Sequence, residues 1–140
     1  MTPLGGGRND TPVPAPSLTA NLRTKCVYDT PEPADGLRVL VTRYWPRGVS
    51  KAAVDEYARA LSPSADLLRA YKDGLLDWPR FRHQYRIEMQ GAQAQSEIAR
   101  LTALAREEMV TLMCVCHDED RCHRSLLSGL IATEISQDEA

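Results

Sequence analysis

The chain has 140 residues, a formal net charge of −2 and a hydrophobic content of 43%, which is typical of one soluble globular domain. This charge argues against general nucleic-acid binding, which usually requires a basic chain. No apolar run approaches the ~18 residues of a membrane span, and the N-terminus lacks the apolar core of a signal peptide. We therefore expect a cytoplasmic protein whose four cysteines are thiols or metal ligands rather than disulfides.

Glycine and proline dominate the first part of the chain. Gly5–Gly7 and the prolines at positions 12, 14 and 16 are accompanied by few large apolar side chains. Such a composition cannot offset the entropy that is lost on ordering the chain. The sequence therefore predicts a disordered tail over residues 1–23 and a single α/β domain over residues 24–140.

Two strands and a helix are predicted in the first half of the domain. Residues 25–28 form the first strand candidate, and residues 37–44, in which apolar side chains alternate between two faces, form the second. A helix is expected over 51–61, with Ser50 as its N-cap and an apolar stripe on one side. Pro63 ends this helix.

Capping residues mark two further helical segments. Ser64 is placed to cap a helix that ends at Gly74. Asp77 opens a third helical segment ahead of a Trp-Pro pair. This segment is interrupted at Gly91, and its helical period then resumes as far as about Arg106.

The C-terminal part of the chain reads as a strand followed by a helix. The apolar run 109–115 is typical of a buried strand, and apolar residues over 126–131 recur at helical spacing. Asp118 or Asp120 is a candidate cap for that helix. The order of elements predicts an α/β fold, with a small sheet of three to four strands, at least partly parallel, and about four to five helices. The relative direction of the first two strands stays open, because the connection 30–36 is short enough for an antiparallel pair.

Two arginines bracket a Trp-Pro turn at the end of the second strand. Arg43, Trp45 and Arg47 lie within five positions, and Lys51 follows. The planar fork of arginine matches carboxylate and phosphate oxygens, so this turn is a candidate anion clamp. In the alternative interpretation Trp45 fills the core and the arginines pair with acidic side chains of neighbouring helices.

A second group of cations follows the last strand. If the two strands that precede these loops are parallel, both loops emerge at one edge of the sheet, and the last helix contributes backbone N–H groups. The shared cavity would then hold an anionic small molecule, such as a nucleotide or a phosphorylated or carboxylated metabolite. Its substrate-binding residues would be Arg43, Trp45, Arg47, Lys51, Arg121 and Arg124.

Cysteine and histidine supply candidate reactive groups beside these cations. Cys122 lies near a helix N-terminus and next to cationic side chains, which lower the pKa of a thiol. We therefore name Cys122 as a candidate nucleophile and His123 as a candidate general acid/base. Cys114 and Cys116 point to the same face of their strand, where Cys114 is most simply a small buried apolar residue. All of these thiols could also be without function in a reducing compartment.

Two other functions remain open. A metal-binding or redox-responsive protein could use a zinc ligand set of cysteine and histidine, composed of Cys116, His117, Cys122 and His123. The spacing of this set matches neither the usual zinc knuckle nor a haem-attachment motif, so we do not favour a metal. A module that binds a protein partner through its arginine surface is the third possibility. No cofactor and no oligomeric state follow from the sequence.

With these residues in view, the sequence resembles the YeaO-like family of bacterial proteins, domain of unknown function 488. The resemblance covers about residues 25–135 and rests on Val27-Tyr28, Asp35–Val41, Arg43–Lys51, Leu61–Ser64, Leu68-Arg69, Trp78, Phe81, Tyr85, Glu88 and Val110–Leu112. It implies an α/β fold and no particular reaction.

The end of the domain departs from the short members of that family, which tend to carry an Asp- and Asn-containing stretch without cysteine. Cys122-His123-Arg124 instead resembles the ending of longer family members. The resemblance implies that Arg43, Trp45, Arg47 and residues 122–124 belong to one site, without assigning a role to any of them.

Overall fold

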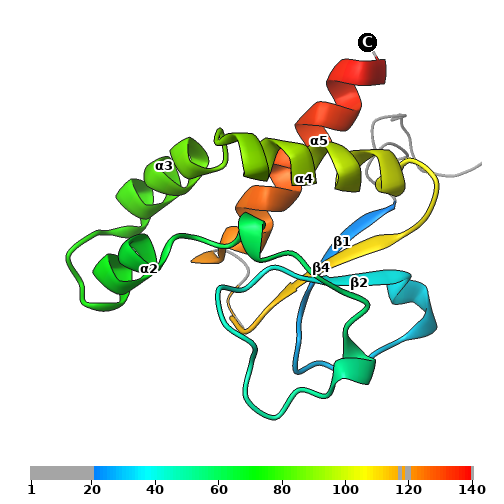
Figure 1. The fold of residues 1–140 in the computed structure, drawn as a ribbon, viewed down its shortest axis with the longest axis horizontal. Coiled ribbons are helices and arrows are strands. Elements are labelled where there is room, and N and C mark those ends of the chain that lie inside the picture. The colour runs from blue at the N-terminus through cyan, green and yellow to red at the C-terminus, as the bar shows by residue number, and fades with distance from the viewer. Residues whose placement is uncertain (1–20, 117, 119–120, 140) are drawn as a thin grey trace, which may run out of the picture.

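The computed structural model describes residues 21–116, 118 and 121–139. Its sheet has four parallel strands in the order β1-β4-β2-β3, of which β1, β4 and β2 are labelled in Figure 1. The strands are β1 (Leu22–Cys26), β2 (Leu37–Leu40), β3 (Glu56–Tyr57) and β4 (Val110–Cys114). The predicted α/β class is confirmed. β1 and β2 are not paired with each other, because β4 lies between them and runs parallel to both.

The inner strand β4 is buried along its whole length. Side chains of a strand alternate between the two faces of the sheet. Leu112 joins the main core, whereas Met113 joins a smaller cluster with Val27 and Leu40 on the opposite face. Burial on both faces explains why the sequence of β4 is an uninterrupted apolar run.

Four α-helices lie in the described part of the chain: α2 (Ala65–Lys72), α3 (Trp78–Glu88), α4 (Ala92–Ala105) and α5 (His123–Glu139). In Figure 1, α4 and α5 cross each other on the same side of the sheet. Both contact β4, and α5 also contacts β1. The main core therefore lies between these helices and the sheet. None of the described helices combines the length and the hydropathy that crossing a membrane would require.

The predicted caps of the middle helices are confirmed. The Ser64 hydroxyl accepts a hydrogen bond from the Leu67 N–H at the start of α2. The Asp77 carboxylate accepts one from the Arg80 N–H at the start of α3. Each cap satisfies a backbone donor that has no partner within the helix. Gly91 separates α3 from α4 and is the N-cap of α4.

The predicted helix over 51–61 is wrong. That segment contains two short 3-10 turns, η3 (Lys51–Ala53) and η4 (Arg59–Leu61), with β3 between them. Hydrogen bonds to β2 determine this path: the Asp55 carboxylate accepts from the Arg38 N–H at 2.8 Å, and the Arg38 Nε donates to the Ala53 carbonyl at 2.9 Å. Pairing with a sheet edge outweighs the local helical pattern.

Two predicted boundaries also differ from the structure. β1 begins at Leu22, inside the stretch that the sequence assigned to a tail, and residues 1–20 lie outside the described residues. α5 begins at His123, so Asp118 lies too far ahead to be its N-cap, and Asp120 is outside the described residues.

A buried carboxylate holds the connection between β1 and β2. Asp35 accepts hydrogen bonds from the Lys25 ammonium at 3.0 Å and from the Glu32 N–H at 2.9 Å, while its carbonyl accepts from the Thr111 hydroxyl at 2.6 Å. Burial by itself raises the pKa of Asp35, but the Glu32 N–H and the Lys25 charge outweigh that effect and hold the pKa below its usual value. Asp35 therefore ties the connection to β1 through its carboxylate and to β4 through its backbone carbonyl.

We expect Asp35→Asn to lower stability at neutral pH by about 1–3 kcal/mol, because it weakens charge-assisted hydrogen bonds in a buried site. The folded-state pKa is depressed, so the contribution of Asp35 is full above the ordinary pKa of about 3.9 and is lost as the pH falls through the folded value. In urea unfolding, the free energy of unfolding should therefore fall less steeply with decreasing pH for Asp35→Asn than for the wild type. Equal acid declines, with the exposed-site variant Asp29→Asn as control, would contradict this assignment.

The residue after Asp35 has no room for a side chain. Gly36 has a φ of 62°, and a Cβ at this position would lie 2.3 Å from the Met109 carbonyl oxygen. Gly74 also has a positive φ, of 77°, but open space surrounds its Cβ position. For Gly74→Ala we expect the free energy of unfolding to fall by roughly 1–2 kcal/mol, which is the cost of backbone strain alone. Gly36→Ala should lower it by well over this amount, because the added Cβ also clashes with Met109. Similar unfolding midpoints for the two variants would refute the close contact.

Candidate functional site

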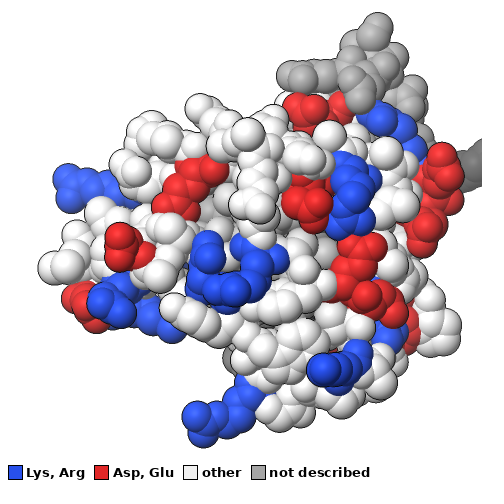
Figure 2. Space-filling view, in the orientation of Figure 1, with Lys and Arg blue, Asp and Glu red and all other residues white. Residues whose placement is uncertain are grey.

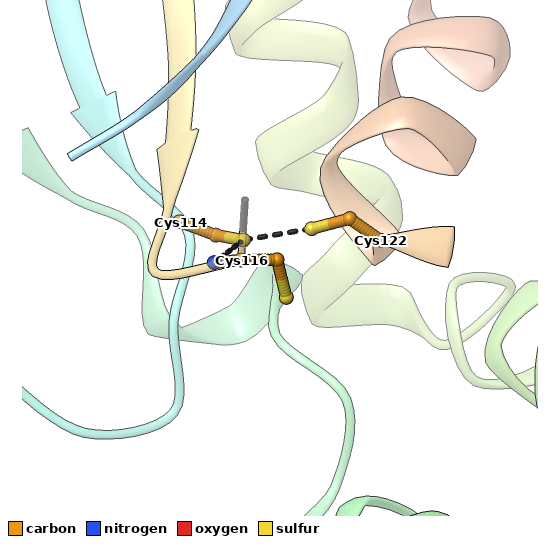
Figure 3. A group of neighbouring side chains, drawn as sticks. All are labelled: Cys114, Cys116 and Cys122. Atoms are coloured by element: carbon orange, nitrogen blue, oxygen red, sulfur yellow. Dashed lines mark hydrogen bonds between the residues drawn. The ribbon is translucent and has the colours of Figure 1, made fainter. Parts of the chain in front are cut away.

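Three cysteine sulfurs lie together where β4 ends and α5 begins (Figure 3). Cys114 is the last residue of β4, and Cys122 directly precedes α5. Their Sγ atoms point toward each other and are 2.7 Å apart, joined by a thiol hydrogen bond. With the Sγ of Cys116, all three sulfurs lie within 4.8 Å of one another. We call Cys114, Cys116 and Cys122 the cysteine cluster.

The alternation of β4 explains how the cluster forms. Leu112 and Cys114 face the main core, and α5 packs over that face. Cys114 and Cys122 are buried, whereas Cys116, on the turn after the strand, is half-buried. The Cys116 N–H donates to the Cys114 Sγ at 3.2 Å and fixes this turn against the strand end. The cluster therefore has two interior sulfurs and one that reaches toward solvent.

A buried guanidinium, that of Arg124 in α5, contacts the cluster. Arg124 is only 2% exposed; its Nη1 donates to the Cys116 carbonyl at 2.5 Å and to the Cys114 Sγ at 3.6 Å. Among the described residues, no carboxylate pairs with this guanidinium, and its buried Nε has no hydrogen-bond partner. An isolated buried cation is costly. A thiolate of the cluster is the anion best placed to compensate it.

The thiols of the cluster share their protons unequally. Hydrogen bonds from the Cys114 and Cys122 thiols, aided by the charge of Arg124, lower the pKa of Cys116 despite its partial burial. The hydrogen bond with Cys116 raises the pKa of Cys114, and the hydrogen bonds with Cys114 and then with Cys116 raise the pKa of Cys122. The arrangement favours one thiolate, on Cys116, stabilised by the two neighbouring thiols and by the nearby charge of Arg124.

His123 lies beside the cluster but faces the end of β2. It is buried, and its Nε2–H donates to the Val41 carbonyl at 2.6 Å. Its ring packs edge-on against the ring of Tyr85, with the two ring centroids 5.7 Å apart. Burial lowers the pKa of His123, although the hydrogen bond to Val41 opposes this effect. Nε2 is thus committed to the backbone, and only Nδ1 remains for a proton transfer.

The cations of the predicted anion site are engaged in different ways. The Nε of Arg43 donates to the Pro63 carbonyl at 3.1 Å, whereas Arg124 faces the cluster. Arg47, Lys51 and Arg121 are exposed. The indole of Trp45 donates to the Val49 carbonyl at 2.9 Å, and its ring meets that of Tyr57 edge-on. Trp45 is therefore at the surface and does not fill the core.

The described part of the chain has a surface cavity elsewhere. Its volume is about 300 Å³, and it is lined by Tyr44, Ala65, Leu68, Arg69, Lys72 and Asp73. None of the predicted binding residues lines it. Figure 2 shows lysines and arginines in several separate groups with acidic side chains close to some of them, and no continuous basic surface on the face in view.

Two members of the cluster, Cys116 and Cys122, are among the predicted metal ligands. Cys114 is buried in the main core, as predicted, but it also joins the cluster, which the sequence does not predict. The available signal was the two-residue spacing that turns Cys114 and Cys116 to one face of a strand. His117, the other predicted ligand, lies outside the described residues. The contact with Cys122 needed the tertiary structure, because it depends on where α5 begins.

Fold and site together define a small α/β protein with a cysteine–arginine cluster at the carboxyl end of an inner parallel strand. The family model described as "Active DUF488-N3 subclade" matches residues 22–135, and the chain belongs to the DUF488 family. The predicted YeaO-like resemblance is thereby confirmed.

Relatives from two bacterial groups support this assignment. "Uncharacterized protein YeaO" of Escherichia coli is 36% identical over 110 residues, which cover 77% of this chain and 94% of that protein. "Uncharacterized protein Rv3073c" of Mycobacterium tuberculosis is 30% identical over 112 residues, covering 79% and 92%. No solved structure gives a significant match.

Cys116 should be the first cysteine to react with iodoacetamide in the native, reduced protein, because the other three cysteines are buried. Since its pKa is lowered, labelling should stay fast at about pH 6, where an ordinary thiol with a pKa of about 8.5 is more than 99% protonated. Peptide mass spectrometry after brief labelling checks both points, with urea-unfolded protein as the control. Earlier labelling of Cys114 or Cys122 would contradict the described exposure.

Proposed function

We propose that this chain is a redox-responsive thiol protein in which Cys114 and Cys122 interconvert between two thiols and a disulfide. The observation that carries the proposal is the 2.7 Å contact between their Sγ atoms. The two sulfurs come from a strand end and a helix start that are fixed in place, so a bond between them needs little rearrangement of the backbone.

The half-buried Cys116 supplies a route for an oxidant to reach the buried pair. A hydroperoxide oxidises its sulfur to a sulfenic acid and leaves as an alcohol, or as water when the oxidant is hydrogen peroxide. The Cys122 thiol then displaces water from that sulfur, and exchange with Cys114 frees Cys116 again. In sum, two thiols and one hydroperoxide give one disulfide, one alcohol and one water, so the two electrons lost by sulfur reduce the O–O bond.

Arg124 supports this chemistry by its position. Its guanidinium contacts the Cys114 Sγ and the Cys116 carbonyl on the interior side of the cluster. A fixed positive charge at this point stabilises the sulfur anion that departs in each exchange step. This role explains why a full charge is buried here with no carboxylate partner among the described residues.

The predicted site for a nucleotide or another anionic metabolite has less support. Arg43 and Arg124 use their guanidinium groups in hydrogen bonds within the fold, to Pro63 and to the cysteine cluster. Arg47 and Lys51 are exposed side chains outside the 300 Å³ cavity. An anion site built from these four cations would require them to converge, and none of the four lines the 300 Å³ cavity.

Titration with hydrogen peroxide tests the proposed function. We expect the reduced protein to lose two of its four thiols, with a Cys114–Cys122 disulfide recovered by peptide mapping and reversed by a dithiol. Cys114→Ser and Cys122→Ser should abolish that disulfide, and Cys116→Ser should slow its formation at least about ten-fold, because oxidation must then start at a buried sulfur.

The control is Cys26→Ser, which removes a buried cysteine that lies outside the cluster and should leave the reaction unchanged. Over-oxidation of Cys116 without any disulfide, or a disulfide that includes Cys26, would refute the proposal. Circular dichroism of each variant separates loss of the reaction from loss of the fold.

A further inference from the structure

We infer that the reduced cysteine cluster is a binding site for a thiophilic divalent cation, and that the bound ion is zinc. The proposal goes beyond the redox function and shares the three cysteines and Arg124 with it. Its donors are the Sγ atoms of Cys114, Cys116 and Cys122, which come from β4, from the turn after it and from the start of α5. In Figure 3 the sulfurs of Cys114 and Cys122 point toward each other, and that of Cys116 lies to one side of them. This set replaces the predicted one, because His123 faces Val41 and Cys114 takes its place.

The spacing of the sulfurs suits a single ion. Thiolates around tetrahedral zinc, with bonds of about 2.3 Å, lie roughly 3.8 Å apart. The three sulfurs lie within 4.8 Å of one another, so most of the required approach is already built into the fold. Cys114 and Cys122, at 2.7 Å, have to separate by about 1 Å, which a small side-chain rotation supplies.

Charge balance gives the second argument. Three thiolates and one divalent cation leave one negative charge, and a buried negative charge requires compensation. The buried guanidinium of Arg124 supplies one positive charge, and its Nη1 already donates to the Cys114 Sγ at 3.6 Å. The loaded site is therefore neutral as a unit. A guanidinium that donates to a ligand sulfur also orients that ligand, as outer-shell partners do in metal sites.

The fourth position of the ion is left open by the described residues. No fourth cysteine, histidine or carboxylate within them joins the three sulfurs. Cys116 is half-buried, so water or a small anion can reach this position from its side. Three protein ligands with one exchangeable position is the arrangement of reactive zinc sites rather than closed structural ones.

The two proposals are linked by chemistry but can fail separately. When Cys114 and Cys122 form a disulfide, the site loses two of its three donors, so oxidation should release the ion. Binding itself needs only reduced sulfurs and no oxidant. Zinc binding without disulfide formation would leave this site standing and refute the redox function, and disulfide formation without zinc binding would do the reverse.

The test is a zinc titration of the untagged full chain, reduced with a phosphine, in competition with a chromophoric chelator. We expect one ion per chain. Cobalt as a substitute should give the intense sulfur-to-metal charge-transfer absorption of thiolate ligation. Cys116→Ser, which changes a half-buried side chain, should keep the fold and weaken zinc binding at least about ten-fold. Cys114→Ser and Cys122→Ser should do the same, and Cys26→Ser should bind as the wild type does.

Arg124→Met tests the role of the guanidinium, because it retains much of the side-chain volume and removes the charge. We expect about a ten- to hundred-fold loss of zinc affinity, with Arg121→Met, an exposed neighbour, as the matched control. Binding weaker than that of the chelator, no charge-transfer band with cobalt, or wild-type affinity in Cys116→Ser would each overturn the site.

Discussion

The buried charge of Arg124 is the constraint on which the site depends. A guanidinium that is 2% exposed must find its partners inside the protein, and its described partners are a carbonyl and a sulfur at the end of β4. This requirement joins the first turn of α5 to the inner strand of the sheet. It also places a positive charge against three sulfurs that would otherwise be ordinary core thiols. The proposed redox chemistry and the proposed metal binding both depend on this one arrangement.

The position of β4 makes the arrangement possible. β4 pairs with β1 on one side and β2 on the other, so its carboxyl end lies inside the sheet rather than at an edge. Asp35 and Gly36 support it from the opposite end, where Thr111 and Met109 meet the connection between β1 and β2. His123 adds a hydrogen bond to Val41, just after β2. α5 is thereby fixed to two strands at once, which holds Cys122 close to Cys114.

Local signals predicted much of the fold. Ser64 and Asp77 were identified as helix caps because their side chains satisfy backbone donors a few residues away, an interaction that is entirely local. The buried strand β4 was recognised from its unbroken apolar run. The helix predicted over 51–61 is wrong for the opposite reason. Its apolar spacing suits a helix, but Asp55 and Ala53 accept hydrogen bonds from Arg38, far away in the sequence, and residues 56–57 join the sheet.

The sequence by itself determined the family, the α/β class, the middle helices and the concentration of cysteine, histidine and arginine near the C-terminus. Only the tertiary structure decided which of those residues contact one another. It turned Arg124 inward and His123 toward Val41, and it left Arg47 at the surface. It also placed Cys114 in the cysteine cluster, which the position of this residue in an apolar strand does not indicate. The physical reason is that a cluster of this kind depends on where a strand ends relative to a helix start, and long-range packing sets that distance.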